Sequence, residues 1–215
     1  MKRKLALLLP VLALAVFAFF GTSEVKADET SPPEAVAYLV NDQTGEKTQL
    51  NVKDVSPTED LLNQAQLRSF SDETNLTKTY EVFTEIPDGT ITTFDSSGGN
   101  KTGGGVTAKI NVNYDISGTD KNKDIKVNSY NGSWTPSSKL YVVGSRVSGV
   151  HSGLITGGKN RQDKPTSNSF SYKTGWGYNV LIKGGNSPRA WMDCKISVSG
   201  MSGTSYTLSL EVTFP

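Results

Sequence analysis

The sequence predicts an all-β protein: an antiparallel β-sandwich of immunoglobulin-like architecture, preceded by a small N-terminal hairpin and a short helix. Three stretches carry this prediction, because apolar and polar residues alternate in residues 106–116, 190–198 and 206–214. Alternation with a period of two places apolar side chains on one face of a strand. Two packed antiparallel sheets need such one-sided strands, so a sandwich is favoured over a small barrel, which remains the alternative.

The clearest of these strands covers residues 106–116. Its apolar face comprises Val106, Ala108, Ile110, Val112, Tyr114 and Ile116. The last two stretches, residues 190–198 and 206–214, are joined by a connection that contains glycine. We expect them to form an antiparallel hairpin that faces the same core as residues 106–116.

The N-terminal part predicts a smaller unit. Residues 35–40 and 48–55 are rich in β-forming residues and flank turn chemistry, which predicts a hairpin. Pro57, followed by acidic residues and a short apolar stripe, predicts a helix of up to about three turns. The chain then divides into a signal peptide (residues 1–27), an N-terminal extension (residues 28–76) and a β-sandwich domain (residues 77–215).

Short strands separated by glycine- and proline-containing turns continue through the domain. Their predicted positions are residues 79–85, 90–94, 125–130, 140–147, 170–172 and 178–182. The single cysteine, Cys194, excludes the Cys…Trp…Cys framework of true antibody domains. It also excludes an intramolecular disulfide, and its inward strand phase predicts a buried thiol.

The first 27 residues predict export. A cationic start, an apolar run over residues 5–20 and the sequence Val25-Lys26-Ala27 are the three parts of a secretory signal, with cleavage after Ala27. An uncleaved anchor is the alternative, but the apolar run is shorter than a spanning helix requires. The signal holds four of the 22 basic residues and one of the 21 acidic ones, so the mature net charge is −2. This balance argues against nucleic acid as a partner.

Three features point to one group of proteins: the signal, the run Asn168-Ser169-Phe170-Ser171-Tyr172-Lys173-Thr174-Gly175-Trp176 and the closing run Thr204-Ser205-Tyr206-Thr207-Leu208-Ser209-Leu210-Glu211-Val212. In these features the chain resembles small secreted all-β proteins of unknown function from Gram-positive bacteria. The resemblance covers roughly residues 77–215 and implies no catalytic residue, cofactor or substrate.

Aromatic residues in loops are the candidate binding residues: Trp176, Tyr178, Tyr172 and Trp134. Exposed Trp and Tyr stack on sugar rings or anchor protein partners. The alternative is that these rings fold back over the edge of the core. Trp191 is out of phase with its apolar neighbours and is expected to face outward, as a surface aromatic or, preferably, in contact with the N-terminal hairpin.

Other chemistry has little support. His151 is the only histidine, and no triad signature surrounds it. Asp115, Asp120 and Asp124 flank one turn, but interleaved lysines favour solvated charges over a calcium site. We therefore predict no catalytic residue, metal or cofactor. The expected function is non-enzymatic binding of an extracellular glycan, wall polymer or protein, without stable membrane insertion after cleavage. A secreted carboxylate- or metal-dependent hydrolase and a bacteriocin- or immunity-type factor are the alternatives.

Overall fold

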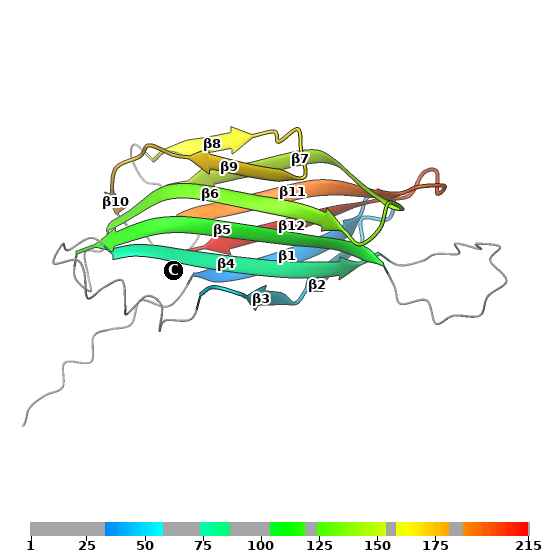
Figure 1. Ribbon diagram of the computed structural model, residues 1–215, viewed down its shortest axis with the longest axis horizontal. Helices are drawn as coiled ribbons and strands as arrows, with labels where there is room; N and C mark the ends of the chain where they lie inside the picture. The colour runs from blue at the N-terminus through cyan, green and yellow to red at the C-terminus, as the bar shows by residue number, and fades with distance from the viewer. Residues whose placement is uncertain are drawn as a thin grey trace, which may run out of the picture.

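The protein folds into two antiparallel sheets that face each other in two layers (Figure 1). The computed structural model describes residues 33–57, 74–86, 104–118, 124–153, 158–180 and 187–214. Within these ranges the chain forms strands and turns and contains no helix. The all-β prediction is therefore confirmed for this part of the chain. The predicted signal peptide with Ala27, the body of the predicted helix and the predicted strand at residues 90–94 lie outside it.

The first sheet has the strand order β2-β1-β12-β11-β7-β8. Its members are β1 (Glu34–Asn41), β2 (Lys47–Leu50), β7 (Tyr141–His151), β8 (Asn160–Asp163), β11 (Arg189–Val198) and β12 (Ser205–Thr213). The hairpin predicted at the end of the chain is confirmed, because β11 and β12 pair antiparallel along their length. A register shift between Asp193 and Lys195 interrupts the pairing of β11 with β7.

The second sheet has the order β10-β6-β5-β4-β3, and β9 also pairs with β6. Its members are β3 (Val52–Asp54), β4 (Thr74–Glu85), β5 (Gly105–Ser117), β6 (Asp124–Pro136), β9 (Ser169–Lys173) and β10 (Asn179–Val180). In Figure 1, β4, β5 and β6 form the near layer, with β1, β12 and β11 behind them. The two layers enclose the core.

The N-terminal strands belong to these sheets. β1 lies between β2 and β12, and β3 pairs with β4, so hydrogen bonds cross the boundary predicted after residue 76. The single strand predicted for residues 48–55 is divided at Asn51. Leu50 pairs with Ala37 in the first sheet, whereas Val52 pairs with Val82 in the second.

The core is built from the inward faces of both sheets, as the alternation predicts. Along β12 every second residue is buried, and β5 shows the same pattern over most of its length. Tyr114 of β5 contacts Phe214, which follows β12, with ring centroids 4.7 Å apart. Cys194 is also buried, which confirms the prediction for this thiol. Its burial raises the pKa of the thiol to about 12, so it stays protonated at neutral pH.

Candidate functional site

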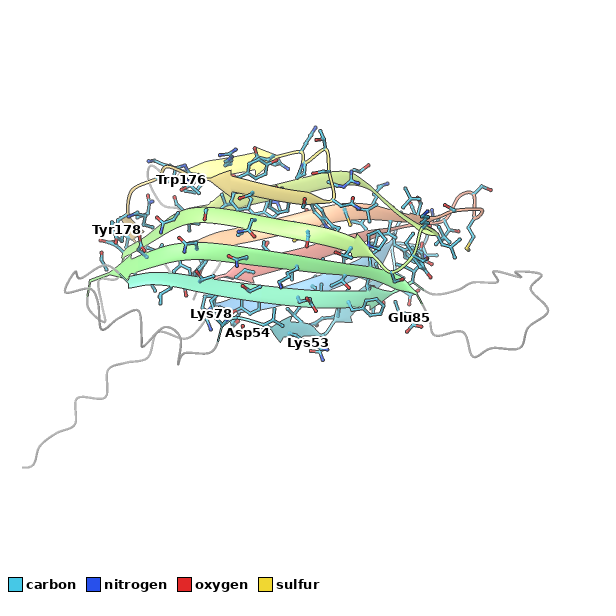
Figure 2. The ribbon with its side chains drawn as sticks, viewed as in Figure 1. Lys53, Asp54, Lys78, Glu85, Trp176 and Tyr178 are labelled. Carbon is cyan, nitrogen blue, oxygen red and sulfur yellow. The ribbon has the colours of Figure 1, made fainter. Side chains whose placement is uncertain are left out.

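The loop between β9 and β10 holds Trp176 and Tyr178 at one end of the second sheet. The Thr174 N–H donates to the Asn128 carbonyl oxygen at 3.0 Å, and the Thr174 hydroxyl donates to the Val127 carbonyl oxygen. The Trp176 N–H donates to the Thr174 hydroxyl oxygen at 3.2 Å. These bonds tie the loop to β6. Figure 2 shows Trp176 and Tyr178 at the same end of the molecule.

Trp176 is half-buried and packs against the core. Part of its indole covers core residues while part stays accessible. Both predictions for this ring, an accessible aromatic residue and a cover for the core edge, therefore hold in part.

Tyr178 is half-buried beside a charged group on the outer face of the second sheet. The Lys126 ammonium lies 5.2 Å from the centre of the Tyr178 ring, a cation–π distance. The same ammonium lies 3.0 Å from Asp115 Oδ2, which also accepts a 3.0 Å hydrogen bond from Asn128 Nδ2. Only 8% of the Asp115 side chain is exposed, so these partners compensate a nearly buried carboxylate.

Trp134 lies in the core, not in a loop. It is 1% exposed, and its ring centroid lies 5.4 Å from that of Phe170. β6 places its side chain on the same inward face as Tyr130, and this strand phase is the signal that sequence reasoning missed. A ring buried in this way is not accessible to a ligand in the described conformation.

Tyr172 is half-buried in the same ring cluster. Its ring stacks on Phe170 at 5.7 Å, and the Arg161 guanidinium lies 4.8 Å from its centroid. The structure thus divides the four candidate residues: Trp134 and Tyr172 join one cluster through Phe170, and Trp176 and Tyr178 lie in the loop beyond β9.

An ion pair within β8 lies beside these aromatic residues, and its hydrogen bonds reach the second layer. Arg161 of β8 binds Asp163 through two nitrogens, at 2.7 and 3.0 Å. Asp163 also accepts a 2.6 Å hydrogen bond from the Tyr130 hydroxyl, and Arg161 Nη1 donates to the Lys173 carbonyl oxygen at 2.8 Å. The hydrogen bonds from Arg161 hold the pKa of Asp163 below its usual value. This ion pair fixes β8 of the first sheet to β6 and β9 of the second.

Two rows of polar residues cross the middle of the outer face of the second sheet, and one of them ends beside the aromatic loop at Lys173. Asn111 of β5 stands between Thr79 of β4 and Asn131 of β6 in the strand register, and Ser171 of β9 follows Asn131. Asn111 Nδ2 donates to Thr79 Oγ1 at 3.0 Å, and Thr79 itself is buried. The next row comprises Thr77, Asn113, Ser129 and Lys173. We call these two rows the amide–hydroxyl face. The polar positions of residues 106–116 were its signal in the sequence, but their lateral partners were not predictable.

The groups with the greatest catalytic potential are buried or neutral. His151 is 8% exposed, and its Nδ1 accepts a 3.1 Å hydrogen bond from the Gly153 N–H. Burial and the nearby Arg189 lower the pKa of His151. Among the described residues, no group of three or more His, Cys, Asp or Glu side chains gathers as a metal site would. In the same part of the chain no helix has the length and apolar character needed to cross a bilayer.

Comparison of the chain with protein-family models, with curated proteins and with solved structures found no match.

Proposed function

We propose that the mature chain is a secreted, non-enzymatic protein of immunoglobulin-like sandwich architecture that binds a glycan, either free or as part of an extracellular wall polymer. The observation that carries this proposal is the continuity between the aromatic loop and the amide–hydroxyl face. Tyr178 lies over Lys126 at the end of a surface whose middle rows are amides and hydroxyls. A protein ligand is the other partner class that the aromatic residues would suit.

The chemistry of this surface matches a sugar. Pyranose rings present C–H faces that stack on aromatic rings, and their hydroxyls both donate and accept hydrogen bonds. Asn and Ser side chains also do both, unlike Lys or Arg, which only donate. Asn111 and Asn113 are two residues, or about 7 Å, apart on one face of β5. A chain of sugar rings that lies along β5 could therefore contact both amides.

Export supports the same function. The signal features of residues 1–27 and the resemblance to small secreted proteins of Gram-positive bacteria support a ligand outside the cell. The mature net charge of −2 disfavours nucleic acid, and cleavage after Ala27 would release the chain from the membrane.

The proposal is tested by titrating the purified mature chain with soluble wall polysaccharide and with N-acetylglucosamine and glucose tetramers, using calorimetry. We expect Tyr178→Ala and Trp176→Ala each to raise Kd about tenfold, because each removes one aromatic contact worth about 1.4 kcal/mol. The matched control is Val142→Ala, a 49% exposed residue of the first sheet, which should bind as wild type does.

If both aromatic variants bind every probe as tightly as wild type, the loop is not the binding site. Chromatography of the same mixtures tests the enzymatic alternative. Accumulation of shorter sugars would favour a hydrolase over a binding protein.

A further inference from the structure

Trp191 lies on the opposite side of the protein, on the outer face of the first sheet. The prediction that it faces outward holds, because Ala190 and Met192 on either side of it are fully buried while Trp191 is half-buried. The preferred contact, with the N-terminal hairpin, is wrong. β12 separates β11 from β1, and the indole lies over Gly149 of β7 instead.

The indole lies face-on against the backbone of Gly149. A Cβ built on Gly149 would stand 2.1 Å from Cζ2 of Trp191, 2.5 Å from Cε2 and 2.7 Å from Cη2. Cε2 and Cη2 are only slightly farther from this point than Cζ2 is, as expected for a point above the ring face. A point beyond the ring edge would lie clearly farther from both. Because residue 149 has no side chain, one face of the ring rests on the sheet, and its other face is directed outward.

Polar groups that suit sugar hydroxyls surround this ring in the strand register. Glu211 of β12 is the direct partner of Trp191 on one side. On the other side Gly149 pairs with Gln162 of β8, whose side chain is exposed. Along β11, Arg189 and Asp193 share the outer face with Trp191. A carboxylate, an amide and a guanidinium thus stand around one flat ring.

The charges around Trp191 nearly balance. Arg189 Nη1 lies 3.6 Å from Glu211 Oε1, so these two charges pair. His151, whose ring centroid lies 6.3 Å from that of Trp191, has a pKa lowered by burial and by Arg189 and is neutral at pH 7. Burial, with the nearby Glu211, raises the pKa of Asp193, which disfavours its charged form. A surface with no excess of positive charge does not attract an anionic polymer electrostatically.

We infer that Trp191, seated on Gly149 and flanked by Glu211 and Gln162, is a second carbohydrate platform that takes a flat, uncharged β-1,4-linked pyranose chain. Equatorial linkages keep such a chain flat, which suits a sheet face. One sugar ring stacks on the outward face of the indole, and its hydroxyls bond to Glu211 and Gln162. This site goes beyond the proposed function, which belongs to the other layer. Two outward-facing sites would let one molecule bridge two glycan chains.

The indole N–H signals of Trp191 and Trp134, the two tryptophans left when Trp176 is replaced, test this inference in a ¹H–¹⁵N NMR spectrum of the mature chain. The protein is titrated with the β-1,4 tetramers of N-acetylglucosamine and of glucose, in a Tyr178→Ala/Trp176→Ala background that removes the proposed loop site. We expect the Trp191 signal to shift with at least one tetramer. The Trp134 signal should stay in place, because that ring is buried. A β-1,4 mannuronate tetramer, which is flat but anionic, should bind at least about fivefold more weakly.

Gly149→Ala is the decisive variant, since it keeps Trp191 but forces the ring off the backbone. We expect it to weaken tetramer binding about tenfold, as Trp191→Ala does, while Val142→Ala has no effect. If Gly149→Ala does not fold, Trp191→Ala and the Trp191 signal of the background protein still decide the matter. A Trp191 signal that stays unmoved by both uncharged tetramers overturns the platform. That result leaves the loop site intact, because the loop site is measured with Trp176 and Tyr178.

Discussion

At the scale of single residues, two aromatic rings pack against glycines on neighbouring strands. Trp191 is the register partner of Gly149, and Phe170 is the register partner of Gly132. In both pairs the ring occupies the space that a side chain on the glycine would need, with ring atoms 2.1 Å and 2.8 Å from the position of a Cβ. The Phe170 pair faces the core and the Trp191 pair faces solvent. The same packing device therefore serves stability in one layer and, we propose, recognition in the other.

The Arg161–Asp163 ion pair of β8 leads to a residue-scale prediction about pH. The folded-state pKa of Asp163 is lowered, so its ionised form stabilises the protein above the unfolded pKa of about 3.9. That contribution is lost as pH falls through the lower folded pKa. We expect Asp163→Asn to cost about 1–2 kcal/mol in the free energy of unfolding at about pH 7 and much less at about pH 3.

Urea denaturation at both pH values measures this difference. Glu46→Gln, in an exposed turn, is the control and should change stability by less than about 0.5 kcal/mol. An equal cost of Asp163→Asn at both pH values would contradict the role assigned to the ionised carboxylate.

At the scale of elements, the strands at the sheet margins are short and charged. β2, β3 and β8 have four, three and four residues. Figure 2 shows Lys53, Asp54 and Lys78 along the β3 margin, where Lys78 Nζ lies 3.3 Å from Asp54 Oδ2. Short charged edges disfavour pairing with strands of other molecules. The long strands, by contrast, lie inside the sheets, and the burial of their alternate apolar side chains stabilises them.

Alternation predicts unequal losses of stability when two apolar residues on adjacent strands are replaced by alanine. Ile110 of β5 is fully buried, whereas Phe83 of β4 is 49% exposed on the outer face. We expect Ile110→Ala to lower the free energy of unfolding by about 2–4 kcal/mol, because it leaves a cavity between the sheets. Phe83→Ala should cost less than about 1 kcal/mol. Thermal and urea unfolding compare the two variants, and similar costs would mean that β4 and β5 do not face the core as described.

At the scale of the whole molecule, an N-terminal strand completes the first sheet. β1 pairs with β12 over eight register positions, from Glu34 opposite Thr213 to Asn41 opposite Tyr206. The turn after β1 adds polar bonds: Asp42 accepts hydrogen bonds from Ser205 at 2.6 Å and from Thr207 at 2.7 Å. Strands from the two ends of the described chain are therefore neighbours, and neither half of the sequence contains the complete sheet.

Removal of the N-terminal strands should therefore abolish folding. A chain that begins at residue 58 lacks β1, β2 and β3 and exposes the long edge of β12, so we expect aggregation and loss of cooperative unfolding. A chain that begins at Asp28 should remain monomeric and unfold cooperatively. Size-exclusion chromatography and circular dichroism compare the two. A monomeric, cooperatively unfolding chain from residue 58 would show that the N-terminal strands are dispensable.

The sequence by itself determined which central stretches become strands and which of their side chains face the core. That information is local, because a strand alternates its side chains with a period of two wherever it occurs. The β11–β12 hairpin was predictable for the same reason, since its two strands are joined by a short connection.

Only the tertiary structure decided which distant strands are neighbours, because strand pairing depends on the packing of the whole core and not on any one segment. Three assignments depended on it: β1 beside β12, Trp134 inside the ring cluster and the Trp191 indole on Gly149. Both candidate binding surfaces are made by rows of residues across several strands, and so neither exists until those strands have paired.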